Sequence, residues 1–109
     1  MADIESRVAW KKDDPALGRD TEAIWDALNH VYPREREGRL KELVAVAYNR
    51  EQAVGACTAR AIEYKVLGAN VFYFRPAILS GPHHDEVLFR LLSTAKDVLQ
   101  VWAHAHPGE

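Results

Sequence analysis

The stretch that constrains the fold most runs from Phe72 to Leu92, where an aromatic segment passes through a short turn into an amphipathic pattern. Residues 72–74 are Phe-Tyr-Phe, a composition typical of a strand. Beyond the turn, apolar residues recur at three- and four-residue steps, which predicts a long helix with one face on a core. These residues are Val87, Leu88, Leu91, Leu92, Ala95, Val98, Leu99 and Trp102. The fold therefore has to accommodate an aromatic strand that leads directly into its clearest helix.

The turn between these two elements is a possible anion site, because a helix N-terminus presents free backbone N–H groups and a positive dipole end. Gly81 suits a tight turn, but Pro82 has no N–H to donate. Asp85 and Glu86 bring negative charge to the same place. Carboxylates at a helix start are also ordinary stabilising residues, worth about 0.3–1 kcal/mol each. The sequence therefore predicts that this turn does not hold a diphosphate.

Ahead of this stretch, the chain predicts a helix and a hairpin. Asp14 before Pro15 is a suitable helix cap, and Gly18–Thr21 offers a second start a few residues later. Apolar residues then recur at helical spacing until Tyr32 and Pro33 end the helix. The other expected elements are a strand at Arg7–Lys11, a charged connector at Arg34–Arg39, hairpin strands at Leu43–Tyr48 and from Ala53 to Val66, and a strand at Val71–Ile78.

Length and composition limit the class of protein. With 109 residues, 48% of them hydrophobic, the chain is predicted to form a single domain over residues 1–109. The pattern predicts an α+β fold (a three-layer α/β arrangement), with a mostly antiparallel sheet of about four strands and helices on both faces. Its 14 basic and 16 acidic residues leave no basic field, so neither nucleic acid nor a membrane surface is an expected partner.

Few residues carry an obvious chemistry. Cys57 lies in an apolar run and is interpreted as a buried strand residue, which also favours a cytoplasmic, disulfide-free protein. His83 and His84 have ligand chemistry, but adjacent residues at a helix start point in different directions, so no metal site is expected. Arg75, at the end of the aromatic strand, is expected to pair with Asp85 or Glu86 across the turn.

The order of the predicted elements resembles the first two thirds of the GNAT-type (Gcn5-related) N-acetyltransferases. The resemblance rests on Leu43–Tyr48, on Val54-Gly55 opening the next strand, and on Phe72–Arg75 before the turn and helix. It extends over about Arg7–Trp102. In that family, the turn after the fourth strand carries Arg/Gln-x-x-Gly-x-Gly/Ala, whose N–H groups hold the pyrophosphate of acetyl-CoA.

The matching positions of this chain depart from that pattern. His84 takes the place of the basic residue, and Val87 and Phe89 take the places of the small ones, so their side chains are expected to project where the backbone approaches the ligand. If acetyl-CoA binds, the resemblance implies that it contacts Ala77, Ile78, Leu79, His84, Asp85, Glu86 and Val87. Glu63 and Tyr64 are the weak candidates for a catalytic role, with a surface ion pair and a half-buried aromatic as the plainer interpretation.

The resemblance also implies a function. The family continues with a further strand after the matching helix, so Val71–Ile78 is expected to be an open sheet edge at which pairing falters near Pro76. A homodimer through this edge would cover it. We therefore expect a non-catalytic relative without a cofactor, acting as a homodimer that binds a small molecule or protein. The alternative is an active acyl-CoA-dependent N-acyltransferase that completes its site across the dimer.

Overall fold

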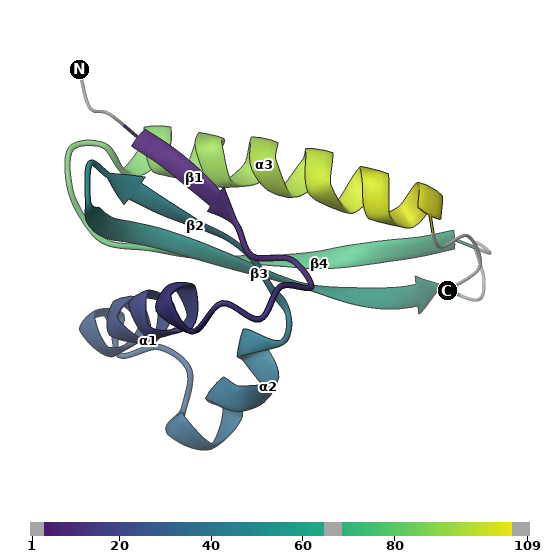
Figure 1. Cartoon of the computed structure of the whole chain (residues 1–109), viewed down its shortest axis with the longest axis horizontal. Coiled ribbons are helices and arrows are strands. Elements are labelled where there is room, and N and C mark those ends of the chain that lie inside the picture. The colour runs from purple at the N-terminus through teal and green to yellow at the C-terminus, as the bar shows by residue number, and fades with distance from the viewer. Residues whose placement is uncertain (1–3, 65–68, 106–109) are drawn as a thin grey trace.

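The computed structural model describes residues 4–64 and 69–105, with side chains described outside 61–71 and 104–105. Its elements are β1 (Ile4–Val8), α1 (Pro15–Leu28), the 3₁₀ turn η1 (Pro33–Glu35), α2 (Arg36–Leu40), β2 (Leu43–Asn49), β3 (Gln52–Tyr64), β4 (Ala69–Ile78) and α3 (His84–Ala105). The four strands form one antiparallel sheet in the order β1-β2-β3-β4. In Figure 1, α3 covers one face of this sheet, and α1 and α2 lie on the other. The predicted α+β class, with helices on both faces, is confirmed.

Local sequence signals account for the ends of α1. Asp14 is its N-cap, and the carboxylate accepts hydrogen bonds from the N–H groups of Ala16 and Leu17 at 3.1 and 3.3 Å. Of the two starts that the sequence offered, the helix therefore uses the earlier one. The helix ends at Leu28, before the expected end at Tyr32 and Pro33, because Asn29 adopts the left-handed conformation with φ 55°. The first strand was expected at Arg7–Lys11 and instead spans Ile4–Val8, the residues that pair with β2.

The pairing of β3 with β4 is regular along its whole length. It runs from Gly55 opposite Ile78 to Tyr64 opposite Ala69 without a shift, and it passes through Pro76. The prediction that pairing falters at Pro76 was therefore wrong, because β4 is the edge strand and pairs with β3 through this residue. The register shifts of the sheet lie instead between β2 and β3. A proline fits an edge strand where its missing N–H faces away from the neighbouring strand.

The core under α3 is apolar and closes on an aromatic cluster. Leu91, Ala95 and Leu99 of α3 are buried against the sheet. Beside them the rings of Trp10, Phe72 and Trp102 meet edge to face, with centroids 5.8–6.3 Å apart.

α3 has 22 residues, but within the described part of the chain no helix combines the length and apolar character needed to cross a membrane.

Close packing of α3 depends on a glycine in β3. A Cβ placed on Gly55 would lie 2.8 Å from Cγ1 of Val87 and 3.2 Å from Cδ1 of Leu91. Both distances are shorter than ordinary van der Waals contact, so any larger residue would push the first turns of α3 away from the sheet. The glycine thus sets how closely helix and sheet approach.

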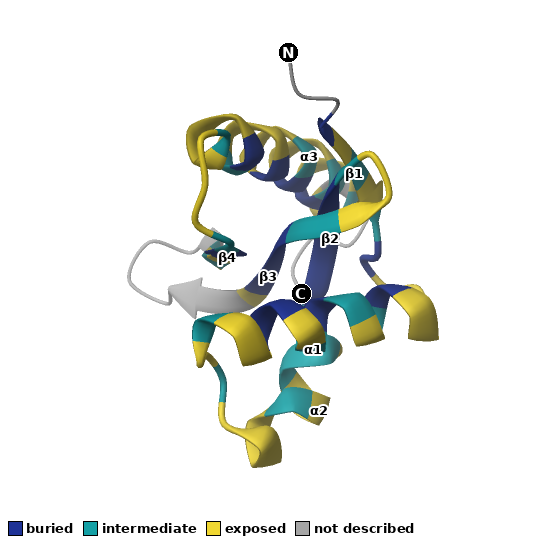
Figure 2. Cartoon of the chain, turned by 90° about the vertical axis from the view of Figure 1, so that its left-hand side faces the viewer, coloured by how far each residue is buried: buried dark blue, intermediate teal, exposed yellow. Residues whose placement is uncertain are grey.

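The core under α1 includes buried polar groups. Ile24 and Trp25 supply its apolar centre, and Figure 2 shows the buried face of α1 turned toward the sheet. Thr21 is fully buried and donates its hydroxyl to the carbonyl of Leu17 at 2.8 Å. Nearby, the hydroxyl of Tyr48 donates to the carboxylate of Asp20. The hydroxyl groups of Thr21 and Tyr48 are thus both held by hydrogen bonds, as burial requires.

Candidate functional site

The residues expected around a cofactor turn do not share one surface. Leu79, His84 and Val87 line a small cavity of about 160 Å³ between the end of β4, the start of α3 and the β2–β3 turn. Ala77 instead is buried in the core on the α1 side of the sheet, whereas Ile78 packs on the α3 side. The alternation of a strand sends neighbouring side chains to opposite faces, which separates these two residues.

Two bulky residues of the turn were expected to project into the anion position, and of the two only Val87 lines the cavity there. Val87 is 2% exposed and packs on Gly55, so it belongs to the core. Phe89 is 68% exposed, and it is absent from the lining of the cavity at the turn. The obstacle to an anion is therefore the charge of Asp85 and Glu86, whose carboxylates lie 3.5 and 3.8 Å from the neighbouring histidine rings.

The catalytic candidates lie at the other end of the β3–β4 pair. Glu63 and Tyr64 are opposite Asn70 and Ala69 in the register, and their side chains lie outside the described residues. Gly55 lies near the other end of the same strand, against the first turns of α3, and is eight positions before Glu63. At the rise of a strand this separates the two positions by about 26 Å along β3. The fold does not bring these candidates to the turn.

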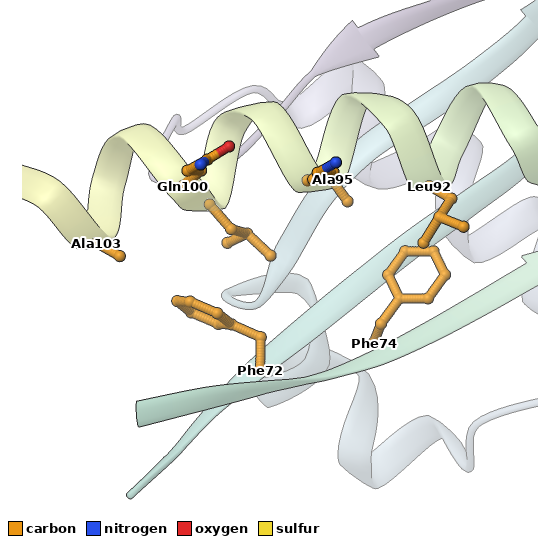
Figure 3. A pocket seen from close by; sticks show the side chains of 8 residues that line it. Phe72, Phe74, Leu92, Ala95, Gln100 and Ala103 are labelled. Atoms are coloured by element: carbon orange, nitrogen blue, oxygen red, sulfur yellow. The ribbon is translucent and has the colours of Figure 1, made fainter. Parts of the chain in front are cut away.

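A larger apolar groove lies between β4 and α3. It has a volume of about 300 Å³. Figure 3 shows Phe72 and Phe74 rising from β4 toward the helix, with Leu92 pointing down toward Phe74. The remaining lining residues come from α3 and are Ala95, Lys96, Leu99, Gln100 and Ala103. Leu92 is 50% exposed, so the groove opens an apolar surface to solvent.

The groove runs along the outer edge of β4, which pairs with no other strand among the described residues. β4 is the last strand of the sheet, and the N–H of Leu79 donates to the carbonyl of Val54 at 2.9 Å. Since backbone groups alternate in direction along an antiparallel strand, the N–H and C=O groups of Phe72 and Phe74 point outward. Pro76 has the same direction and has no N–H to offer there. The outward donors thus coincide with the aromatic part of the groove.

Arg75 makes an ion pair inside the molecule, as expected, but with a different partner. Its Nη2 lies 3.0 Å from Oε1 of Glu42, and its guanidinium lies 5.3 Å from the ring centroid of Tyr73. The expected pairing with Asp85 or Glu86 was wrong, because Arg75 points to the face that carries α2, whereas α3 starts on the other face.

The other reactive residue types lie apart from the groove. Cys57 is 1% exposed in the core under α3, and burial raises the pKa of its thiol to about 12. This agrees with its interpretation as a buried strand residue, since a thiol that stays protonated is a poor nucleophile. Within residues 4–64 and 69–105, no three His, Cys, Asp or Glu side chains are placed to hold a metal ion.

Sequence reasoning found the aromatic edge but missed the helix side of the groove. Lys96, Gln100 and Ala103 interrupt or extend the apolar stripe of α3, and nothing in that stripe distinguishes Leu91, which is buried, from Leu92, which is half exposed. A stripe broader than one helix face was the available signal.

Comparison with protein-family models, with curated proteins and with solved structures gave no match to this chain.

Proposed function

We propose that this chain is a non-catalytic relative of the acetyl-CoA-dependent N-acetyltransferases that acts as a homodimeric binding module. The order of elements, β1-α1-α2-β2-β3-β4-α3, and the antiparallel sheet order β1-β2-β3-β4 both agree with the arrangement that the resemblance implies. This agreement supports a shared architecture, and function has to be argued from the surfaces of the chain itself.

The observation that carries the proposal is that the open edge of β4 and an apolar groove lie side by side. A second copy that pairs with β4 in antiparallel fashion would lie across a two-fold axis perpendicular to the sheet. Both α3 helices would then be on the same face, side by side over the joined edges. Phe74 and Leu92 of one copy would meet the corresponding groove of the other, which removes exposed apolar surface from water.

Two observations argue against catalysis. The carboxylates of Asp85 and Glu86 stand at the helix start where a diphosphate would have to bind. The weak catalytic candidates, Glu63 and Tyr64, are eight or more positions along β3 from Gly55, beside the turn. General acid–base catalysis needs its groups within hydrogen-bonding reach of the reacting thioester, so a role for Glu63 or Tyr64 would require acetyl-CoA to extend from the turn along β3.

The dimer is tested by light scattering on the purified chain, comparing Leu92→Lys with Phe89→Lys. Both are exposed apolar residues of α3, but only Leu92 lines the groove. We expect the mass of two chains for the parent protein and for Phe89→Lys, and the mass of one chain for Leu92→Lys. Circular dichroism confirms that both variants fold. A parent protein that is monomeric at about 100 μM, far above the Kd of a stable dimer, would refute the proposal.

One observation favours the alternative of an acyl-CoA-dependent enzyme. The cavity of about 160 Å³ at the start of α3 lies where the resemblance would put the pyrophosphate. Titration calorimetry with acetyl-CoA decides between the two. Micromolar binding, followed by thiol release over a panel of amines, would establish the enzyme and exclude the non-catalytic role. Heat equal to dilution would exclude the enzyme.

A further inference from the structure

A second cavity, on the opposite face of the sheet, is lined mainly by arginines. It lies between α2 and the part of the sheet formed by β3 and β4, and its volume is about 400 Å³. The lining residues are Arg34, Glu35, Gly38, Arg39, Glu42, Arg60 and Arg75. Four guanidinium groups thus face two carboxylates, which leaves an excess of two positive charges in the lining.

The hydrogen-bonding capacity of this cluster is only partly used. Arg75 donates to Glu42 at 3.0 Å, and Nη2 of Arg39 donates to the buried hydroxyl of Thr58 at 3.2 Å. The Nε atoms of Arg39 and Arg75 are both buried without a hydrogen-bond partner. The unpaired Nε donors show that the acceptors of the chain do not satisfy the cluster. Because these two atoms have no exposed surface, an anion in the cavity would be bound by the other N–H groups of the guanidiniums.

Neighbouring Arg36 shows what a structural arginine looks like in the same segment. Its Nη1 lies 2.6 Å from the carboxylate of Asp26, and its Nε and Nη2 donate to the carbonyls of Val31 and His30 at 3.1 and 3.4 Å. These bonds hold a loop in which Val31 has a φ of 49°, an unfavourable conformation for a β-branched residue. All three side-chain nitrogens of Arg36 thus have partners within the fold, whereas the four arginines of the cavity keep unused donors.

The half-buried guanidinium groups of Arg39 and Arg75 each lie beside an aromatic ring. Arg39 lies 5.6 Å from the ring centroid of Trp25, and Arg75 lies 5.3 Å from that of Tyr73. Such contacts orient the planar groups before any ligand arrives, which reduces the entropy lost on binding. Burial, and then the positive charge of Arg75, lower the pKa of Arg39. Glu42 and Glu35 act in the opposite direction without outweighing these effects, so an anion in the cavity would add to their counter-charge.

We propose that this arginine cavity binds the phosphate group of a small phosphorylated molecule. A phosphate monoester carries close to two negative charges at neutral pH, which matches the excess charge of the lining. Its oxygens accept several hydrogen bonds in the geometry that guanidinium groups provide. The cavity is larger than a bare ion needs, which leaves space for the organic part of the ligand. This inference names a ligand class for the binding role proposed above.

The test uses inorganic phosphate and glycerol phosphate as probes, with acetate and chloride at equal ionic strength as the other arms. Calorimetry and thermal shift are measured on the parent chain, Arg39→Gln, Arg60→Gln and Arg90→Gln. Arg90 is an exposed residue of α3 outside the cavity, so its variant loses the same charge elsewhere. We expect phosphate to raise Tm, Arg39→Gln and Arg60→Gln to bind it about tenfold more weakly or worse, and Arg90→Gln to bind normally.

Arg60 is exposed, so Arg60→Gln remains informative even if Arg39→Gln fails to fold. Equal weakening in Arg60→Gln and Arg90→Gln would show a general charge effect and overturn the site, as would binding of acetate as tight as that of phosphate. No phosphate binding up to about 10 mM, a concentration at which even very weak sites fill, would also overturn it. The oligomer proposal fails separately, because Leu92→Lys is expected to abolish the dimer and keep phosphate binding.

Discussion

The two faces of the sheet differ in how their helices pack and in which polar groups they hold. Under α3 the buried side chains are almost all apolar, and the layer is packed so closely that a glycine is needed at position 55. Under α1 and α2 the core contains buried hydroxyls, and toward β4 it gives way to the arginine cavity. Substitutions of buried residues on the first face should therefore act mainly on stability, whereas exposed groove residues such as Leu92 should act on the proposed dimer. Substitutions on the second face should separate into effects on stability, on pH dependence and on ligand affinity.

The largest effect is expected from Leu91→Ala. Leu91 is completely buried under α3, so truncation leaves a cavity and should lower the free energy of unfolding by about 2–5 kcal/mol. Leu92→Ala is the matched control, since the adjacent residue is half exposed and should cost less than about 1 kcal/mol. Urea unfolding followed by circular dichroism measures both. Equal losses would mean that the groove side of α3 is as important for folding as its buried side.

The next effect concerns alkaline pH. Burial, followed by the hydrogen bond to Asp20, raises the pKa of Tyr48 from 10.0 to about 12. The unfolded chain releases this proton near pH 10 and the folded chain keeps it until about pH 12. Stability therefore falls as the pH rises from 10 to 12, by up to about 2–3 kcal/mol from this group.

Tyr48→Phe should remove that part of the alkaline loss. The comparison is made in a Cys57→Ala background, because the pKa of Cys57 is also raised to about 12 and would add to the same window. Urea unfolding at pH 8 and pH 11.5 gives the two slopes. If Tyr48→Phe loses as much stability as its background over this interval, the tyrosine hydroxyl does not couple folding to pH.

Gly55→Ala should lower the free energy of unfolding by about 1–3 kcal/mol, because the added methyl group would overlap Val87 and Leu91. Gly38→Ala in α2 is the opposite control. No atom lies within 4 Å of a Cβ at Gly38, and alanine favours helix, so this change should be neutral or stabilising by up to about 1 kcal/mol. Thermal unfolding distinguishes the two signs.

The smallest effect on stability is expected from Arg60→Gln. Arg60 is exposed at the mouth of the arginine cavity, so its loss should change the free energy of unfolding by less than about 0.5 kcal/mol. Denaturation in phosphate-free buffer measures this. A loss above about 1 kcal/mol would assign the cavity to folding and weaken the division between the two faces.

Local patterns were enough to predict most of the fold. The cap at Asp14, the apolar spacing of α3 and the hairpin at residues 49–52 each depend on neighbours in sequence, so they could be read without knowing the tertiary structure. The position of the aromatic edge followed from the order of elements. The partner of Arg75 did not, because it depends on which face of the sheet α2 covers.

The arginine cavity could not be predicted for the same reason. Its residues come from three separate segments, around α2, in β3 and in β4, and they meet only through the register that places Thr58 opposite Arg75. The signal available in the sequence was alternation: Thr58 and Arg60 share one face of β3, and Tyr73 and Arg75 share one face of β4. Without the pairing, nothing showed that both pairs face α2.

The glycine at position 55 has a consequence for how this sequence can change in evolution. Most core positions accept an exchange between apolar residues of similar volume, whereas position 55 accepts nothing larger than hydrogen without displacing a helix. As this sequence diverges, glycine at position 55 should therefore change more slowly than the core residues around it. It is a marker by which distant kin could be recognised after most other similarity has been erased.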